Sequence, residues 1–309
     1  MAALSPMMQQ YFDIKKQHPD KILFFRLGDF YEMFYDDAIL VSKELELTLT
    51  GRDCGQEERA PMCGVPFHSY ENYVARLIAK GYKVAICEQM EDPALAKGLV
   101  KRDIIRVVTP GTVIESSMLQ DDKNNYIASI YITEKKAGVC FADVSTGTAH
   151  ATVLTGEKLG PEIISELCRY SPSEVLFNAA ILDYKEVTAY IKQQLACSVE
   201  LLDEAAFAPD ACMEEMRAQF GDAPEKTAGL APESPAFTAL AVLLGYLKET
   251  QKKGVERLKT VHNYAEAQYM QLSPVTRANL ELTETMRGRE KKGTLLWVLD
   301  KTQTAMGKR

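Results

Sequence analysis

The chain has 309 residues, with a hydrophobic content of 46 % and a charged content of 26 %, which are ordinary values for a globular protein of two or three domains. No apolar run approaches the roughly 18 to 20 residues that cross a membrane. The N-terminus also lacks the basic region and apolar run of a signal peptide. These features exclude a membrane-spanning protein and indicate a cytoplasmic one.

The net charge of −7 argues against nucleic-acid binding through overall charge. The charge is uneven, because residues 116–253 carry 12 basic and 20 acidic side chains, whereas residues 254–309 carry 10 and 6. This difference favours separate modules. Any contact with a nucleic acid is then expected from a local patch, such as the basic stretch 97–102 with Arg106 nearby.

The seven cysteines are scattered along the chain and form no CxxC pair. An odd, dispersed set of this kind indicates free thiols in a reducing compartment. Cys54, Cys63, His68 and Cys87 are conceivable zinc ligands, but their spacing matches no common zinc site. No metal is therefore expected.

Residues 1–115 predict a compact mixed α/β domain. In chain order, we expect a helix over 6–17, a strand over 21–27, a helix over 36–44, a strand over 45–50, a loop over 51–60, a rigid irregular segment over 61–66, a helix from Ser69 that stops at Gly81, and strands over 83–88 and 104–108. Ser5 as N-cap and Pro6 at the first helical position favour the start of the first helix.

The stretch Gly28–Phe34, with the sequence GDFYEMF, places an aromatic ring beside a carboxylate. In an extended strand Phe30 and Glu32 share one face with Phe34, whereas Tyr31 and Met33 take the other. Such a pair makes a poor core, because a buried unpaired carboxylate is costly. From spacing alone, burial of Phe30 against Phe24 and Phe34 is still the safer interpretation, with Glu32 as a solvated surface acid. The alternative is that both side chains are presented to a ligand.

Residues 116–125 predict a polar linker, and residues 126–253 a second α/β domain. Within it we expect strands over 126–133, 138–144 and 146–154 in an antiparallel meander, a helix over 161–170, a short strand over 174–177, a helix over 184–194, a surface loop over 221–234 and a long helix over 235–253. From residue 254 onward, a short strand over 268–272 and the start of a helix over 274–280 indicate a further module, truncated at residue 309.

The stretch Asp143–Gly147, with the sequence DVSTG, has two interpretations. Asp and Gly at these positions are typical of a hairpin corner. An acid at the end of a strand is also the start of a metal-dependent nuclease or phosphotransferase site. That chemistry needs several convergent carboxylates, and the sequence offers no partner acids at strand ends. The hairpin corner is therefore favoured.

Several stretches together resemble the bacterial MutS family of DNA mismatch repair. Besides Gly28–Phe34, they are Pro6–Tyr11, Pro61–His68, Ala85–Gln89, Arg106–Thr112, Asp143–Gly147 and Thr276–Leu282. They occur in the family's order along the whole chain. The resemblance implies a mismatch-binding domain over 1–115, an RNase H-like connector domain over 126–253, and the beginning of a mostly helical core domain over 254–309.

The resemblance also implies site residues and partners. Phe30 would be an aromatic wedge inserted from the minor groove and Glu32 a discriminating carboxylate. Weaker candidates for DNA contact are Arg52, Met62, His68, Arg76, Lys101 and Arg102. The implied partners are mismatched double-stranded DNA, a second copy of the full-length protein, and a MutL-type protein that binds the connector.

The family continues through a clamp and a C-terminal ATPase that binds ATP and Mg²⁺, and this chain has neither. Its nearest imitation of a Walker A loop, Gly288–Thr294, lacks the Lys-Ser/Thr pair after the second glycine. No catalytic activity and no cofactor are expected of this chain. A silent fragment is a further alternative, because the family's grip on DNA uses a dimer and a clamp.

Overall fold

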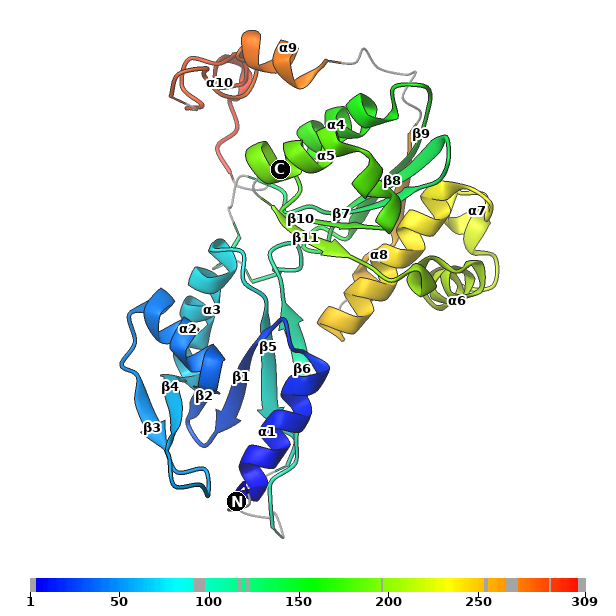
Figure 1. Cartoon of the computed structure of the whole chain (residues 1–309). Coiled ribbons are helices and arrows are strands. Elements are labelled where there is room, and N and C mark those ends of the chain that lie inside the picture. The colour runs from blue at the N-terminus through cyan, green and yellow to red at the C-terminus, as the bar shows by residue number, and fades with distance from the viewer. Residues whose placement is uncertain are drawn as a thin grey trace. The chain divides into compact units, whose positions relative to one another are not determined.

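A computed structural model describes residues 4–91, 98–115, 118–119, 123–195, 197–252, 255–264, 272–288 and 290–304. By their contacts the residues divide into two compact units, 1–118 with 249–253 and 119–248 with 254–309, and each is described by itself (Figure 1). Each unit contains a mixed sheet with helices, which confirms the predicted α/β class. None of the described helices is long and apolar enough to cross a membrane.

The first unit is built on a six-stranded sheet in the order β3-β4-β2-β1-β5-β6. Its elements are α1 (Pro6–Gln17), β1 (Ile22–Leu27), β2 (Phe30–Phe34), α2 (Tyr35–Leu45), β3 (Thr50–Arg52), β4 (Ala60–Pro66), α3 (Tyr70–Ala79), β5 (Val84–Gln89) and β6 (Arg102–Val108). Strands β1 and β5 are parallel, and the other neighbours are antiparallel. The sheet therefore holds β2 between β1 and β4, away from its edges.

The two faces of this sheet are covered by different helices. On one face Tyr11 of α1 packs edge-on against Phe34, with ring centroids 5.1 Å apart. On the other face Tyr31 contacts Tyr70 of α3 at 4.9 Å. The buried carboxylate of Asp37 in α2 accepts the Leu23 N–H at 3.0 Å and joins α2 to β1. Residues that alternate along β2 thus enter two separate cores.

Two predictions for the first unit are wrong. Residues 45–49 are not a strand, because α2 extends to Leu45 and Glu46 then turns the chain with φ +58°. The strand here is β3, which begins only at Thr50 and takes in residues 51 and 52 of the predicted loop. Residues 61–66 are not irregular but belong to β4, which pairs with β2 over Met62–Pro66 and with β3 over Ala60–Met62. Its two prolines stand where pairing tolerates them, with Pro66 at the end of the strand. Tertiary pairing outweighs the low strand propensity of this segment.

The second unit has a six-stranded sheet in the order β11-β10-β7-β8-β9-β12. Its strands are β7 (Ile127–Ile132), β8 (Lys136–Asp143), β9 (Thr148–Thr155), β10 (Glu174–Phe177), β11 (Ser198–Leu201) and β12 (Thr260–Asn263). Its helices are α4 (Leu159–Tyr170), α5 (Lys185–Tyr190), α6 (Pro209–Phe220), α7 (Pro224–Ala228), α8 (Pro235–Gln251), α9 (Pro274–Asn279) and α10 (Leu295–Leu299). The antiparallel meander β7-β8-β9 is confirmed.

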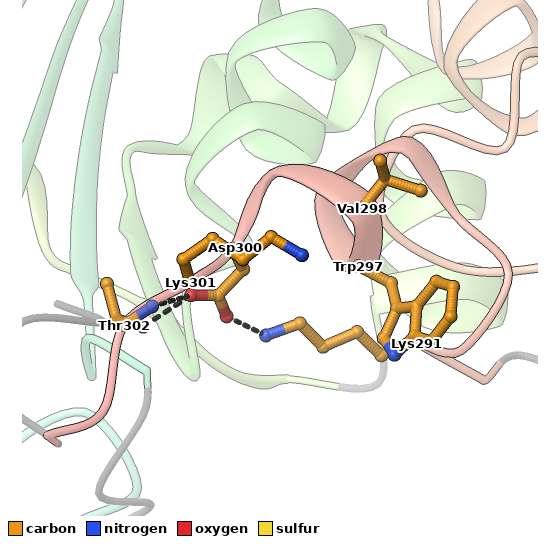
Figure 2. A pocket seen from close by; sticks show the side chains of 6 residues that line it. All are labelled: Lys291, Trp297, Val298, Asp300, Lys301 and Thr302. Carbon is orange, nitrogen blue, oxygen red and sulfur yellow. Dashed lines mark hydrogen bonds and ion pairs between the residues drawn. The ribbon is translucent and has the colours of Figure 1, made fainter.

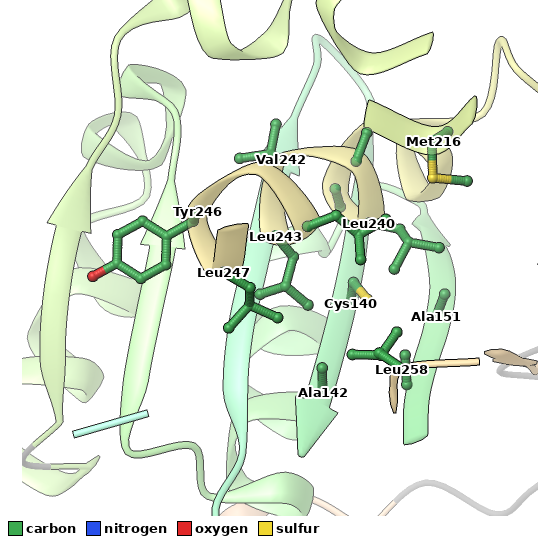
Figure 3. Packing of buried hydrophobic residues seen from close by; sticks show 14 of the residues in the cluster. Cys140, Ala142, Ala151, Met216, Leu240, Val242, Leu243, Tyr246, Leu247 and Leu258 are labelled. Atoms are coloured by element: carbon green, nitrogen blue, oxygen red, sulfur yellow. The ribbon is translucent and has the colours of Figure 1, made fainter. Parts of the chain in front are cut away.

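The apolar helix α8 forms the largest core cluster of this unit. Figure 3 shows Leu240, Leu243 and Leu247 of α8 directed toward the small side chains of Cys140 and Ala142 on β8. The opposite face of the sheet is covered by α4, α5 and the π-helical turn Ile191–Leu195 that follows α5, which contribute Ile163, Leu167, Val187 and Ile191. Because both faces are covered, the central strands are apolar on both sides.

Several elements of this unit are absent from the sequence-based prediction. They are β11, α6, α7, β12 and α10, and α7 lies inside the segment 221–234 that was expected to be a loop. The predicted helix at 274–280 is confirmed as α9, where the Ser273 hydroxyl accepts the Thr276 N–H at 3.1 Å. The predicted strand at 268–272 falls, except for Leu272, outside the described residues.

Candidate nucleic-acid interface

Strand β2 changes from core to surface along a single face. Phe34 is fully buried, whereas Phe30, on the same face four residues earlier, is 46 % exposed. Tyr31 and Met33 are buried on the opposite side, as the alternation predicts. The interpretation of Phe30 as a core residue is therefore wrong, and its ring is available to a ligand.

The turn before Phe30 is held by contacts from two directions. Gly28 adopts φ +56°, in the left-handed region that favours glycine. The Phe67 N–H donates to the Asp29 carbonyl at 2.9 Å. Arg26 donates through Nε to the Gly28 carbonyl, and its guanidinium lies 3.7 Å from the centre of the Phe67 ring. These contacts fix the backbone from which Phe30 projects.

Glu32 is not a solvated surface acid. Its Oε2 accepts a hydrogen bond from Nη1 of Arg52, and the two side chains are 12 % and 36 % exposed. The two residues come from β2 and β3, which are separated by β4, so the side chains meet above β4. Gly64 stands opposite Glu32, and a Cβ there would lie 3.4 Å from Glu32 Cγ. That distance is an ordinary van der Waals contact, so the Glu32 side chain packs closely over Gly64.

Arg102 has a structural environment. It is 8 % exposed, and its guanidinium donates to the Arg26 carbonyl at 2.7 Å and to Gln10 Oε1 at 3.0 Å. Burial lowers the pKa of this guanidinium, and the positive charge of Arg52 acts in the same direction. A buried group with these partners has few donors left for a phosphate, so Arg102 supports the interface from beneath.

The other predicted contact residues are dispersed. Met62 is half-buried on β4 and packs against the core under α1, which fits the packing interpretation. His68 is exposed, with its ring edge-on to Phe67 at 6.0 Å. Arg76 is exposed on α3, over the face opposite Phe30, and Lys101 is exposed just before β6. The structure therefore groups only Phe30, Glu32 and Arg52.

Sequence reasoning missed three residues that position this site. Arg26 and Phe67 form the stack beside the turn, and Gln10 holds Arg102. A cation inside the otherwise apolar run 22–27, directly before Gly28, is a signal that pointed to Arg26. The partner Phe67 is distant in sequence, and no local pattern identifies it.

Asp143 braces the corner between β8 and β9. Its buried carboxylate accepts the Ser145 N–H at 2.9 Å, the Ser145 hydroxyl at 2.6 Å and the Asn125 N–H at 3.2 Å. The predicted hairpin corner is confirmed. Across the described ranges, no three His, Cys, Asp or Glu side chains gather as a metal site would require.

We expect Asp143→Ala to lower the free energy of unfolding by about 2–4 kcal/mol, because two backbone donors and one hydroxyl lose a charged acceptor inside the fold. Urea denaturation followed by circular dichroism measures this effect. Ser145→Ala is the matched control, since it removes one donor and leaves the carboxylate in place, and it should cost about 1 kcal/mol or less. Equal midpoints for Asp143→Ala and the unmodified protein would contradict the bracing role.

The chain matches three family models in succession. They are MutS domain I over residues 5–117, MutS domain II over 125–261 and MutS domain III over 275–309. The chain belongs to the MutS family. It is 51 % identical over its whole length to the DNA mismatch repair protein MutS of Ruminiclostridium cellulolyticum and 50 % identical to that of Acetivibrio thermocellus. It spans 35 % of the length of each of these curated relatives.

The site lies inside the domain I match, and Asp143 lies inside the domain II match. The glycine-containing stretch 288–294 falls in MutS domain III, and its described residues have structural partners. Lys291 pairs with Asp300, and the Thr294 hydroxyl accepts the Trp297 N–H at 3.1 Å to cap α10. A pocket of about 420 Å³ lies beside them. Figure 2 shows the side chains that line it, which are Lys291, Trp297, Val298, Asp300, Lys301 and Thr302.

All seven cysteines are free thiols, as the sequence predicts, and five of them are buried. Burial raises the pKa of the Cys63 thiol and of the Cys87 thiol to about 12. His68, by contrast, is exposed. These thiols therefore stay protonated at neutral pH, in which state they are poor metal ligands.

Proposed function

We propose that this chain forms the mismatch-binding part of a DNA mismatch repair protein, as the names of its relatives suggest. The observation that carries the proposal is the exposure of Phe30 at the start of an otherwise buried strand, beside the carboxylate of Glu32. An apolar ring of this size exposed on a rigid turn suits insertion into another molecule. The match to MutS domain I over residues 5–117, which include Phe30 and Glu32, supports the proposal.

Phe30 is the wedge. An aromatic ring pushed into a base step from the minor groove unstacks the bases and kinks the duplex, at a cost of about a few kcal/mol per step. A mispaired or unpaired base has already lost part of its stacking and pairing. Insertion costs less there, so the protein recognises deformability rather than base sequence.

Glu32 provides discrimination. A carboxylate close to DNA is repelled by the phosphates, so its presence needs a specific bond that offsets the repulsion. When ionised it accepts a hydrogen bond from a base edge, and when protonated it donates one to an acceptor such as a purine N7. Paired bases keep most of these edges occupied or out of reach. The repulsion on normal duplex therefore contributes to selectivity.

The proposal is tested by titrating the full-length protein with two duplexes that differ by one mismatched base pair. We expect tighter binding to the mismatched duplex, and the ratio of the two dissociation constants measures the preference. The comparison is made at one fixed salt concentration, because phosphate contacts make both affinities depend on salt. Equal affinities for the two duplexes would contradict the proposed function.

For Glu32→Gln we expect tighter binding to the fully paired duplex, by about tenfold or less, and a reduced preference for the mismatch. Removing one negative charge near phosphates relieves a repulsion of about 1 kcal/mol in a solvated setting. The matched control is Glu71→Gln on α3, which makes the same charge change on the opposite side of the sheet. An unchanged ratio of the two affinities in Glu32→Gln would refute the repulsion argument.

The wider activity of the whole protein belongs to the same proposal. We expect the full-length protein to bind and hydrolyse ATP outside this chain, to act as a homodimer, and to contact a MutL-type protein through the domain around β7–β9. The free thiols fit a cytoplasmic protein. A nuclease centred on Asp143 has no supporting observation, because that carboxylate is already engaged by the hairpin.

A further inference from the structure

Glu32 already has a partner in the protein without DNA. Arg52 offsets part of the negative charge of the carboxylate, and the pair is only partly shielded from solvent, since the Arg52 side chain is 36 % exposed and that of Glu32 is 12 % exposed. The positive charge of Arg52 also acts on the buried Arg102. Arg52 is thus attracted by Glu32 and repelled by Arg102, and the exposed part of its side chain borders the solvent.

The direction of the Glu32 side chain conflicts with the role proposed for it. Phe30 and Glu32 share a face of β2, so a bond to the base beside Phe30 requires Glu32 to point along β2. The carboxylate is instead bound by Arg52, which comes from β3 on the other side of β4 and pairs there with Ala60. The ion pair must open, or rearrange substantially, before Glu32 reaches a base.

We propose that Arg52 is a specificity-determining residue. In the free protein and on paired DNA, Arg52 stays bound to Glu32. When a mispaired base takes its place on Glu32, Arg52 moves to a backbone phosphate. This inference rests on the proposed function, because it assigns a second step to the same site. Arg52 then converts the local detection of a free base edge into an additional grip on the DNA backbone.

The exchange is feasible because a partly exposed ion pair contributes little to stability, so that a hydrogen bond from a base is sufficient to replace it. The released guanidinium is a planar donor well suited to a phosphate. On paired DNA the base edges are occupied, Arg52 stays on Glu32, and the phosphate contact is not made. Mismatched DNA therefore gains one more phosphate contact than paired DNA.

The salt dependence of binding tests this difference, because each neutralised phosphate adds about 0.9 to the slope of log affinity against log salt. In the unmodified full-length protein, we expect the slope for mismatched duplex to exceed that for paired duplex by about 0.9. In Arg52→Gln this difference should vanish, because the slope measured with the mismatched duplex decreases to that of the paired duplex. In Glu32→Gln the difference should also vanish, because Arg52 is released on every duplex and the slope measured with the paired duplex increases.

Lys43→Gln is the matched control, since it removes an exposed cation of the same unit, in the last turn of α2, that has no part in the ion pair. It should leave the difference between the two slopes unchanged. Equal slopes in an unmodified protein that still prefers the mismatch would overturn the inference and leave the proposed function standing. A fall of both slopes in Arg52→Gln would overturn it too, since Arg52 would then contact phosphate on every duplex. Absence of any mismatch preference would overturn the proposed function itself.

Discussion

Phe30→Ala is expected to reduce the affinity for mismatched DNA by about 5- to 150-fold and to leave the affinity for paired DNA nearly unchanged. Stacking of a base on an aromatic side chain is worth about 1–3 kcal/mol by alanine substitution. The whole contribution is lost with the ring, because Phe30 projects from the surface and has no packing role that the alanine would retain. On paired DNA the wedge is not inserted, so little is lost.

Competition between mismatched and paired duplexes for the full-length protein measures this result. Leu49→Ala is the matched control, because Leu49 is 47 % exposed, almost the same fraction as Phe30, and lies outside β2. It should leave both affinities unchanged. Phe30→Tyr keeps the ring and should retain most of the preference. If Phe30→Ala bound mismatched DNA as tightly as the unmodified protein, the wedge assignment would be wrong.

The sequence predicts the exposed pair on β2 only in part. Alternation placed Phe30 and Glu32 on one face, and the strand pairing confirms this geometry. The spacing of residues along the strand does not reveal that this face is buried at Phe34 and exposed at Phe30. That difference depends on how far α1 extends over the sheet. Whether a ring is buried depends on its tertiary neighbours. The family resemblance, and not the two-residue alternation of the strand, predicted that the Phe30 ring is exposed.

The partners of the site residues were beyond sequence reasoning for a physical reason. Glu32 and Arg52 are 20 residues apart in the sequence, and they meet because β4 pairs with both of their strands and brings them into one sheet. Arg102 appeared as a surface cation, yet it is buried against backbone carbonyls and Gln10. A side chain's charge is visible in a sequence, but the desolvation and partners that decide its role are not.

The secondary-structure elements show the same contrast between what local sequence predicts and what depends on distant partners. The β7-β8-β9 meander was predictable because its strands are joined by short polar turns and pair locally. Strand β12 was missed, since it has four residues and pairs in parallel with β9, more than a hundred residues earlier. Helix α6 buries Cys212 and Met216, a pair at helical spacing that is too sparse to indicate a helix by itself.

Gly138→Ala is expected to destabilise the second unit by at least about 3 kcal/mol, a larger cost than that of a typical substitution. Gly138 lies in the central strand β8, between Tyr131 of β7 and Val153 of β9. A Cβ there would lie 2.0 Å from the carbonyl carbon and oxygen of Pro235, the first residue of α8. The obstructing atoms are backbone, so no rotamer change relieves the overlap and α8 itself must shift.

The shift propagates because α8 carries the apolar side chains that form the core of this unit (Figure 3). We expect the melting temperature to fall by about 6–12 °C, measured by calorimetry.

Gly245→Ala is the matched control, since the same added methyl lies inside α8 and would meet Glu215 Cγ at an ordinary 3.6 Å. Alanine is favoured over glycine inside a helix by about 1 kcal/mol, so this control should hold or raise the melting temperature. Opposite signs for the two substitutions would show that backbone contact between α8 and β8, rather than loss of glycine as such, determines stability. A melting temperature unchanged by Gly138→Ala would mean that the two elements do not touch there.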